Sequence, residues 1–465
     1  MDKNILKGKR IAITALELEN KEHRGISAVI KSTINILSKY GAEIYLITSF
    51  EKGIESKNKT KKEINNIYIK EIYDFLNIGI DHRNIFKANK KYKLKIIIEL
   101  IISYFKLVLN NFLLRYELYK VENNYKYINN KNPRISYLEN VQGFISIRNI
   151  FHLCRLRSMR LLIKDPILNI KIKDIDLVIS SSPLSIKKEK SENAQIIQLI
   201  HDALPIQISN HPENNKVFLH RLKDAHNNCS CLYVSEETKK VVRNILNIKS
   251  SDRKLDRTIY PMPSLETELL EKAFDIPFLR SIRNPYILFN SSIVERKKVE
   301  NAINYFLCSN LPKRNFLLCI AGKLHENDYC QYIKEICKNH GNILLLDYVS
   351  ELEKAWLFLN TSLLISTSSS EGFGIPLLDA LSLNLSSIAT EIPSYLEIKN
   401  LNNANKINLI NSNNKNYWIK NLNYVKNFEL DNKYNKRQRI NYFRSSITIL
   451  EKNYLSSIKM FLNID

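Results

Sequence analysis

The chain has 465 residues, of which 44% are hydrophobic and 25% are charged. This length excludes a small single-core protein, because one core stops growing at about 250–300 residues, and two domains are expected. The formal net charge of +23 favours polyanionic partners such as nucleotide phosphates, nucleic acid or anionic lipid, unless it only reflects the general excess of Lys, Ile and Asn.

Cysteine usage and the apolar segments bear on the cellular compartment. The seven cysteines are scattered, and Cys229 and Cys231 form a C-x-C pair with no second pair or His cluster nearby in the sequence. This usage predicts reduced, mostly buried thiols. A charged N-terminus leads straight to the first strand pattern near Arg10, so no secretory signal is expected. Residues 96–114 are apolar but carry Glu99, which argues against a membrane span. We therefore expect a cytoplasmic protein.

The first elements form a strand–helix–strand unit. Residues 9–15 are an apolar run that predicts a strand, and apolar positions at helical spacing over 26–37 predict the helix that follows. Gly41 lies where the glycine that ends a helix belongs, and residues 44–48 predict a second strand. Such a unit implies a parallel sheet.

A basic and apolar region follows, after which strands and helices alternate again. Residues 87–164, rich in Lys, Arg, Ile, Leu and Phe, predict a helical insertion. Further strands are expected at 176–180, 195–200, 231–235, 286–289, 316–321, 343–346, 363–366 and 387–390. Helices are expected from 236 and at about 299–306, 329–338, 351–359 and 375–383. The Asn- and Lys-rich stretch 400–436 predicts loose order, and 442–462 predict a last helix.

This order predicts two doubly wound α/β domains that face each other across a cleft. The N-terminal domain covers 1–262, with the helical insertion at about 87–164. Residues 263–284 form a linker with one helix, 285–435 form the C-terminal domain, and the helix within 436–465 packs back on the N-terminal domain. Ligands of such sheets bind outside the carboxyl ends of the strands, so strand-to-helix loops of both domains should form the site.

The strongest local motif lies at 368–379, after a predicted strand and at the start of a helix. Gly372 and Gly374 let the backbone approach a ligand closely, and free N–H groups at the start of the helix then face that ligand. Glu371 and Asp379 can each bind a pair of hydroxyl groups. Taken alone, the motif could also be an ordinary glycine-containing turn with surface acids.

The segment Glu371-Gly-Phe-Gly-Ile-Pro-Leu-Leu-Asp-Ala resembles the acid-x7-acid motif of retaining GT-B glycosyltransferases, specifically glycosyltransferase family 4. Further segments agree with that family in order: Ile200-His-Asp-Ala-Leu-Pro, Asn214-Asn-Lys-Val-Phe-Leu-His-Arg-Leu, Val234-Ser-Glu-Glu-Thr-Lys, Tyr286-Ile-Leu-Phe-Asn-Ser-Ser-Ile-Val-Glu-Arg-Lys-Lys, Asp347-Tyr-Val-Ser and Ala389-Thr-Glu-Ile-Pro-Ser-Tyr-Leu-Glu. The resemblance covers most of 175–398 and the first strand–helix–strand unit. It implies the GT-B fold, with two Rossmann-like domains, the N-terminal one on the acceptor side and the C-terminal one binding a nucleotide-sugar.

The resemblance also implies roles for individual residues. Glu371 matches the first acid, which contacts hydroxyls of the donor sugar, and His201 matches an active-site histidine close to donor and acceptor. The donor would further be bound by a basic pair at the diphosphate, by loop backbone and by a second acid at the ribose: Arg296, Lys297, Gly372, Phe373, Gly374 and Asp379. Gly25 matches the glycine of the first loop, near diphosphate and acceptor. Without the resemblance, the basic run could be a solvated surface and His201 a structural residue.

Several positions depart from the family pattern. Asp379 is one methylene shorter than the usual Glu, which puts its ribose contact in doubt. Ser27 stands where Gly-Ile-Gly forms have the second glycine, and Asn290, Ser291 and Ser292 stand where Gly-Arg often precedes the basic turn. Asn384 occupies a usual glycine position, and Asn tolerates left-handed backbone better than most residues. A weakened or inactive member is therefore an alternative.

The resemblance implies a retaining hexosyltransferase with a GDP- or UDP-sugar donor, mannose from GDP being the family-based suggestion. The acceptor would be a glycan or an isoprenoid-lipid-linked glycan in lipopolysaccharide or other cell-surface polysaccharide synthesis. The leaving phosphate would help to deprotonate the acceptor. No cofactor and no essential metal are expected, since Asp174-Ile-Asp176 precedes its strand instead of lying on a strand-end loop.

Two other classes of function stay open. One is a catalytically weakened scaffold on a membrane surface, and the other is a nucleic-acid-binding protein. The second is the weaker, because no basic stripe interleaved with aromatics forms a known reader motif, and we expect no nucleic-acid partner. Residues 87–120 suit either an amphipathic helix lying peripherally on an anionic inner membrane face or a helix packed over the N-terminal sheet.

Overall fold

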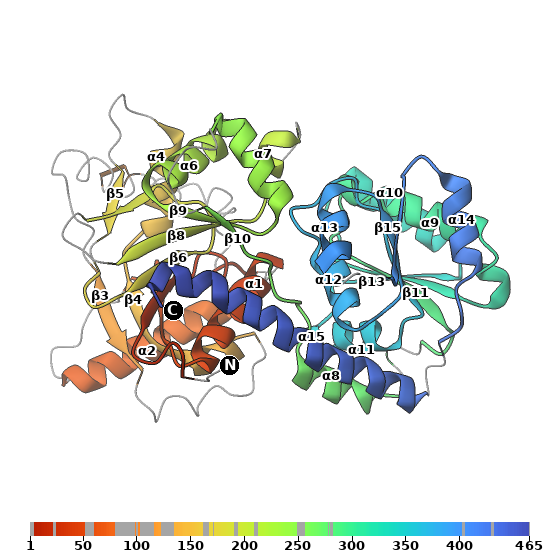
Figure 1. Cartoon of the computed structure of the whole chain (residues 1–465), viewed down its shortest axis with the longest axis horizontal. Helices are drawn as coiled ribbons and strands as arrows, with labels where there is room; N and C mark the ends of the chain where they lie inside the picture. Colours follow the sequence, from red (N-terminus) through yellow and green to blue (C-terminus); the bar gives the residue numbers. More distant parts are fainter. Residues whose placement is uncertain are drawn as a thin grey trace. The chain divides into compact units, whose positions relative to one another are not determined.

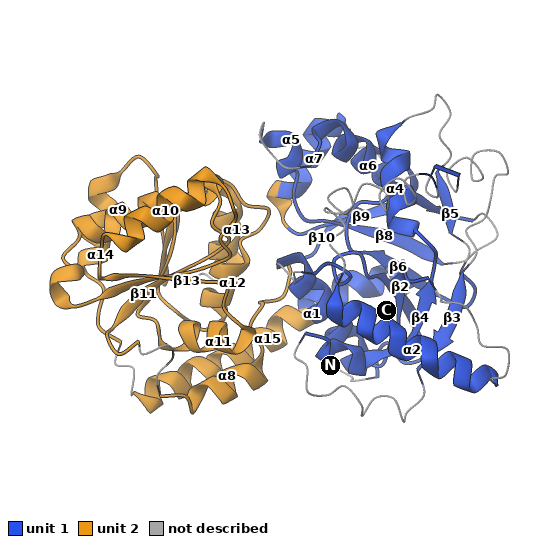
Figure 2. Ribbon diagram, turned by 180° about the vertical axis from the view of Figure 1, so that it is seen from behind, with its two compact units in different colours: residues 1–234, 238–259, 453–465 blue, residues 235–237, 260–452 orange. Residues whose placement is uncertain are grey.

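The computed structural model describes residues 4–21, 25–51, 60–79, 98, 101–102, 116–121, 134–160, 167–170, 172–189, 194–208, 213–248, 256–277, 279, 282–401, 405–428 and 432–464. The chain divides into two compact units, coloured separately in Figure 2, and each is described by itself. Unit 1 comprises residues 1–234, 238–259 and 453–465, and unit 2 comprises residues 235–237 and 260–452.

Unit 1 contains an eight-stranded sheet in the order β10-β9-β8-β6-β1-β2-β4-β3. Its strands are β1 (Arg10–Thr14), β2 (Glu43–Thr48), β3 (Glu117–Lys120), β4 (Val141–Ser146), β6 (Leu177–Ser180), β8 (Gln195–Ile200), β9 (Ser230–Tyr233) and β10 (Arg257–Thr258). All neighbours are parallel except β3, which runs antiparallel to β4. The strands of the inner part are nearly continuous apolar runs, as expected where helices cover both faces.

The helices of unit 1 lie on both faces of this sheet, with α1 and α2 on one side and α4, α6 and α7 on the other (Figure 1). They are α1 (Gly25–Lys39), α2 (Lys61–Ile78), α4 (Ile150–Met159), α5 (Leu204–Gln207), α6 (Asn215–Asn228) and α7 (Glu236–Leu246), with a 3₁₀ turn at Ser136–Asn140. A separate pair of parallel strands is formed by β5 (Leu168–Ile170) and β7 (Ile186–Lys188). The hydroxyl of Tyr454, from the end of α15 (Lys433–Lys459), lies 2.6 Å from that of Thr33 on α1, within the same unit.

Unit 2 contains a six-stranded parallel sheet in the order β13-β12-β11-β14-β15-β16. The strands are β11 (Tyr286–Asn290), β12 (Leu317–Ala321), β13 (Ile343–Asp347), β14 (Leu363–Ser366), β15 (Ser387–Thr390) and β16 (Ile407–Ile410). The helices are α8 (Thr267–Phe274), α9 (Val299–Cys308), α10 (Asp328–Lys338), α11 (Glu351–Asn360), α12 (Ile375–Ser382), α13 (Pro393–Leu401), α14 (Lys415–Asn423) and most of α15, with 3₁₀ turns at Glu295–Lys297, Pro312–Arg314 and Met460–Leu462, the last of these in unit 1.

The strand order of unit 2 reverses at β11. The next two strands of the chain, β12 and β13, lie on one side of β11, and β14 to β16 lie on the other. This is the Rossmann order, and unit 1 repeats it around β1. Helices α9, α10 and α14 cover one face of the unit 2 sheet, and α8 and α11 lie on the other (Figure 1). The prediction of two doubly wound, Rossmann-like α/β domains is confirmed.

The interpretation of 87–164 as one helical insertion is wrong where the structure describes it. Residues 117–120 and 141–146 are the strands β3 and β4, whereas the described residues 98, 101 and 102 are helical and 150–159 form α4. Phe144 and Ile145 are buried in the sheet, and a short apolar run of this kind cannot be told from a buried helix by spacing alone. Most of residues 87–115 lie outside the described residues.

The prediction of loose order over 400–436 is also wrong in part. Residues 407–410 form the edge strand β16, and residues 415–423 form α14. Trp418 and Leu422 of α14 are fully buried in the core of unit 2, although Asn and Lys surround them in the sequence. A few well-spaced apolar residues were enough to fix these elements. In the part of the chain that the structure describes, no helix is long and apolar enough to cross a membrane.

Candidate functional site

The reversal of strand order in unit 2 brings two loops together beyond the carboxyl ends of β11 and β14. The first loop ends in the 3₁₀ turn Glu295–Lys297, and the second runs from Thr367 to Gly374, where α12 begins. Ligands of doubly wound sheets bind outside the carboxyl ends of the strands, at the point where the strand order reverses. The candidate site of unit 2 is therefore formed by these two loops.

Glu371 is the centre of this site. Its carboxylate accepts a hydrogen bond from Nζ of Lys297 and another from Nη1 of Arg296 at 3.0 Å. The hydroxyl of Ser368 donates to Oε1 at 2.8 Å, and the hydroxyl of Tyr395 lies 3.3 Å from the same oxygen. Only 6% of the Lys297 side chain and 8% of the Glu371 side chain are exposed. The structure thus brings together three of the residues predicted for the site.

The charge state of Glu371 follows from these contacts. Burial opposes ionisation and is the largest single influence on its pKa. The positive charges of Lys297 and Arg296, with the hydrogen bonds from Lys297 and Ser368, outweigh burial and lower the pKa to about 2. Glu371 is therefore a carboxylate at every pH at which the protein is expected to work.

Hydrogen bonds between the two loops hold this arrangement. The backbone carbonyl of Arg296 accepts from the backbone N–H of Ser369 at 2.8 Å. The hydroxyl of Thr367 donates to the carbonyls of Lys297 at 3.0 Å and Lys298 at 2.7 Å. Lys298 itself adopts a left-handed backbone, with φ 48°, which ends the basic turn and starts α9. The loops therefore position the two cations from the backbone as well as through Glu371.

Gly374 is required by both its backbone and its surroundings. Its φ of 112° is a conformation that side chains rarely adopt, and a Cβ atom there would lie 2.4 Å from Cε1 of Tyr395. The backbone carbonyl of Gly372 accepts a hydrogen bond from the hydroxyl of Ser235 at 2.8 Å. Phe373 is buried and stacks on Tyr260, with ring centroids 5.6 Å apart. Phe373 and Gly374 are thus buried, and the loop leads directly into the first turn of α12.

Asp379 occupies a different environment from the one the resemblance implies. It lies on α12, is fully buried, and accepts hydrogen bonds from the backbone N–H and the hydroxyl of Ser264 at 2.6 and 2.5 Å. The N–H of Leu265 lies 3.4 Å from the same carboxylate. Burial raises the pKa of Asp379 to about 6, although Lys354 and these hydrogen bonds act in the opposite direction. Both oxygens of the shorter acid are therefore bonded to residues 264–265.

In unit 1, His201 directly follows the strand β8. Its Nε2 lies 2.8 Å from the backbone carbonyl of Ser181, the residue that follows β6. A carbonyl can only accept, so Nε2 carries the proton and Nδ1 is left as an acceptor in the neutral ring. Burial lowers the pKa of His201 to about 4, against a smaller opposing effect of the Ser181 hydrogen bond. The neutral tautomer is thus fixed by the fold.

Gly25 is the first residue of α1 and is exposed. Nothing lies within 4 Å of the position that its Cβ would take, and its backbone is not left-handed. The fold of unit 1 therefore does not require glycine at this position. Ser27, where some family members have a second glycine, is buried and donates its hydroxyl to the carbonyl of Glu17 at 3.0 Å, which anchors the β1–α1 loop. Asn384 has φ 53°, so this Asn does take the left-handed backbone of the usual glycine.

The sequence analysis assigned no role to three residues that the structure places at the unit 2 site. Ser368 and Tyr395 both contact Glu371; Tyr395 lies in a segment that resembles the family, and Ser368 lies three residues before the segment that begins at Glu371. Gly322 follows β12, and a Cβ there would lie 1.6 Å from the carbonyl oxygen of Ser291 in the β11 loop. In the sequence, a glycine directly after a predicted strand could have indicated that the backbone of another loop lies close to Gly322.

Comparisons with known proteins agree with this architecture. Residues 276–442 match the family model described as glycosyl transferases group 1. No curated protein matches the chain. Among solved structures, sucrose-phosphate synthase from Thermosynechococcus elongatus is similar with a TM-score of 0.55 at 11% identity over 98% of both chains.

Two further solved structures share the fold. A complex of S. aureus TarM with fondaparinux, alpha-GlcNAc-glycerol and UDP has a TM-score of 0.53 at 15% identity, covering 98% of this chain and 100% of that one. Anabaena HepE in complex with UDP and glucose has a TM-score of 0.52 at 10% identity, covering 97% and 100%. The match at 276–442 includes the whole Glu371 site. The chain therefore has the GT-B fold, and residues 276–442 form a glycosyl transferases group 1 domain.

Proposed function

We propose that this protein is a retaining glycosyltransferase of the family 4 type, which transfers a hexose from a nucleoside-diphosphate sugar to a glycan or lipid-linked glycan acceptor. The observation that carries the proposal is the buried contact of Glu371 with Lys297 and Arg296 at the strand-order reversal of a group 1 domain. TarM and HepE, which share the fold, were solved with UDP. Mannose, a GDP donor and cell-surface polysaccharide synthesis remain suggestions of the sequence resemblance.

In the proposed reaction, bonds break and form only in the donor and the acceptor, and the protein forms no covalent bond. The bond from the sugar C1 to the diphosphate oxygen breaks, and a bond from C1 to the acceptor oxygen forms on the same face. The acceptor proton passes to the leaving diphosphate. Lys297 and Arg296 would stabilise the charge that grows on the diphosphate, a contribution that is large where water is excluded. We propose no essential metal for this step, because two fixed cations can supply that charge.

Glu371 has two tasks in this proposal. Its carboxylate holds the two cations at the carboxyl end of β11, and Oε2, which among the described residues is bonded only to Arg296, would accept a hydroxyl donor of the sugar. His201 is neutral and offers Nδ1 as an acceptor, so its role would be to accept a hydroxyl of the donor or acceptor rather than to carry charge. Asp379 would support the loop at 264–265 rather than bind the ribose.

Ligand-dependent melting of the purified full chain tests this function. A ligand that binds only the folded state raises the melting temperature, so GDP, UDP and their hexose conjugates are compared at equal concentration. We expect one nucleotide series to stabilise the wild type and Lys297→Ala and Glu371→Gln to reduce that shift. Lys334→Ala and Glu335→Gln, exposed positions on α10, are the matched controls and should keep it.

The responding donor is then used to assay transfer, with the anomeric configuration of the product read by NMR. Retention without added divalent metal supports the proposal in full. Inversion would contradict the retaining mechanism. Absence of any shift with every nucleotide-sugar at millimolar concentration would contradict an active transferase and would favour the scaffold alternative, for which binding to anionic vesicles is the next measurement.

A further inference from the structure

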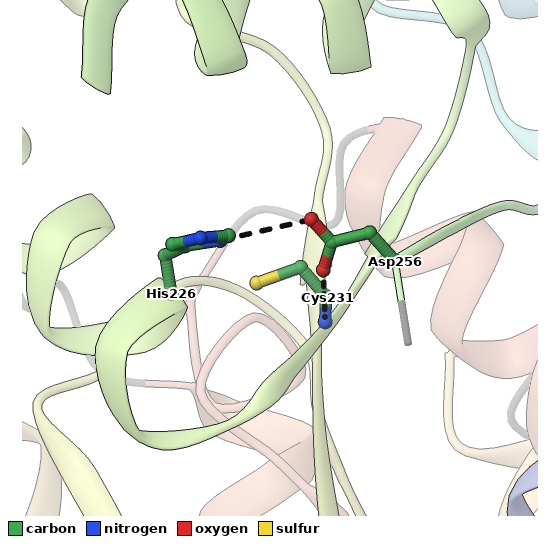
Figure 3. Close-up of side chains that lie close together, drawn as sticks. All are labelled: His226, Cys231 and Asp256. Carbon is green, nitrogen blue, oxygen red and sulfur yellow. Dashed lines mark hydrogen bonds and ion pairs between the residues drawn. The ribbon is translucent and has the colours of Figure 1, made fainter. Parts of the chain in front are cut away.

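A second group of chemically reactive side chains lies in unit 1, where three segments of the chain meet. His226 is in the last turn of α6, Cys231 is on β9, and Asp256 directly precedes β10. Their imidazole, sulfur and carboxylate point toward one another (Figure 3), and the three ligand atoms all lie within 4.8 Å of one another. We propose that these residues bind a divalent transition-metal ion such as Zn²⁺.

The distances fit metal ligands better than a simple ion pair. Nδ1 of His226 is 3.7 Å from Oδ2 of Asp256, which is too long for a hydrogen bond. In a tetrahedral zinc site with bonds of about 2.0–2.2 Å, nitrogen and oxygen ligands are separated by roughly 3.4 Å. A small rotation of the two side chains would therefore close the set on one ion. Nitrogen, thiolate and carboxylate are the ligand types that zinc prefers, whereas calcium and magnesium require oxygen.

The carboxylate of Asp256 has partners outside the ligand set. The backbone N–H of Cys231 lies 3.4 Å from Oδ1 of Asp256, and Nη1 of Arg243 lies 3.6 Å from Oδ2. Only 11% of the His226 side chain and 4% of the Asp256 side chain are exposed. Partners of this kind orient ligating side chains and raise metal affinity. Because Arg243 contacts the carboxylate from outside the ligand set, it would also offset part of the negative charge of the site.

The surroundings of Cys231 favour a thiolate–metal bond. Cys231 and Tyr233 lie on the same face of β9 and belong to an apolar cluster with Phe218, Leu222 and Val242. A dry site of this kind disfavours an isolated thiolate but stabilises one that is bonded to a cation.

Binding would add a link between three elements of unit 1, namely α6, β9 and β10. An ion at the site would connect the end of α6 and the strand β9 to the short edge strand β10, which contributes only Arg257 and Thr258 to the sheet. Three protein ligands leave a fourth position for water. Binding forms a bond between the metal ion and the sulfur of Cys231 and releases the thiol proton to solvent. The affinity for the metal should therefore fall as the pH is lowered.

This site contains none of the residues proposed for glycosyl transfer, so the metal-site proposal can fail or stand independently of the proposed function. The sequence could not show it, because Asp256 is separated by 25 residues from Cys231 and no short metal-binding motif connects them. Cys229 provides a matched control. It is two residues away and buried, but its sulfur lies on a different core cluster, 3.2 Å from Nε2 of Gln198.

The experiment is metal loading of the full chain with Co²⁺, which reports thiolate ligation through a sulfur-to-metal charge-transfer band, together with zinc analysis by mass spectrometry. We expect one ion per chain and the thiolate band in the wild type and in Cys229→Ser. Cys231→Ser should lose the band, and Asp256→Asn should bind at least tenfold more weakly. Circular dichroism of the metal-free variants checks that each one is folded.

Two outcomes would overturn the proposal. One is a folded wild type that takes up no Co²⁺ or Zn²⁺ beyond the level of a chelator-treated blank, which would make the cluster a metal-free ion pair. The other is equal binding by Cys231→Ser and Cys229→Ser, which would place the ion elsewhere. The sulfur band is absent from oxygen- or nitrogen-only surface sites, so it separates this site from adventitious binding.

Discussion

Lys297 and Glu371 are 74 residues apart in the chain and form an ion pair that is almost entirely buried in unit 2. Removing one member of such a pair leaves the other as an unpaired buried charge, which typically costs about 3–5 kcal/mol. Removing both should cost less than the sum of the two single changes. The pair therefore couples the stability of the two site loops.

A double-mutant cycle with Lys297→Met and Glu371→Gln measures this coupling. We expect each single variant to lower the free energy of unfolding by about 2–5 kcal/mol and the interaction free energy to be about 1–3 kcal/mol. Both tryptophans, Trp356 and Trp418, lie in unit 2, so tryptophan fluorescence during urea unfolding reports that unit selectively. Additive effects of the two changes would show that the pair does not stabilise the site.

Gly374→Ala should be strongly destabilising. The substitution adds a Cβ to a residue with φ 112° and places it 2.4 Å from the ring of Tyr395, which contacts Glu371. We expect a loss of more than about 2 kcal/mol in the same tryptophan assay and a loss of nucleotide-sugar binding. Gly341→Ala is the control, because nothing lies within 4 Å of its Cβ position and its φ is not left-handed. Equal effects at the two positions would contradict the packing argument.

Asp379→Asn should change how the stability of unit 2 depends on pH. The folded-state pKa of Asp379 is about 6 and the ordinary value is 3.8, so between these values the folded chain binds a proton that the unfolded chain does not. Stability from this group is therefore fully present below about pH 4 and is lost as the pH rises through 6. The free energy of unfolding of the wild type, relative to that of Asp379→Asn, should increase by about 2–3 kcal/mol when the pH is lowered from 7 to 4.

Subtracting the variant from the wild type removes the contribution of groups that titrate equally in both. Glu335→Gln, at an exposed position on α10, is the control: the difference in free energy of unfolding between the wild type and this variant should not change between pH 7 and pH 4. A wild-type advantage that stays constant with pH would mean that folding leaves the pKa of Asp379 unchanged, and would contradict the effect of burial. Ser264→Ala should lower the stability of the wild type more than it lowers the stability of Asp379→Asn, because the side chains of Ser264 and Asp379 share a hydrogen bond.

Much of the fold could be predicted from the sequence because parallel strands buried on both faces are short, continuous apolar runs. The strands β11, β12, β14 and β15 lie within one residue of the predicted ranges. The errors occurred where that signal is ambiguous. Residues 141–146 follow a long region of mixed Lys and apolar residues, and 407–423 are dominated by Asn and Lys although Trp418 is fully buried.

The candidate site could be predicted in part, and the limit is physical. The resemblance pointed to Lys297 and Glu371 as separate ligand contacts, but which polar groups pair with one another depends on loop geometry. The two loops meet only because β11 and β14 are neighbours in the sheet. The turn of Asp379 toward Ser264 likewise depends on where residues 260–265 pass relative to α12, and no local pattern encodes that path.

His201 should stay neutral over the whole range from pH 5 to pH 8. Its pKa is lowered to about 4 by burial, and Nε2 is bonded to the carbonyl of Ser181. As the pH falls from 6.5 toward 4, the unfolded chain takes up a proton at this residue that the folded chain does not, so this group removes stability in that window. Ring carbon and nitrogen shifts in NMR spectra, assigned by comparison with His201→Gln, measure the midpoint and the tautomer directly. A midpoint near 6.5, or a protonated Nδ1 at neutral pH, would contradict the fixed tautomer and with it the acceptor role of Nδ1.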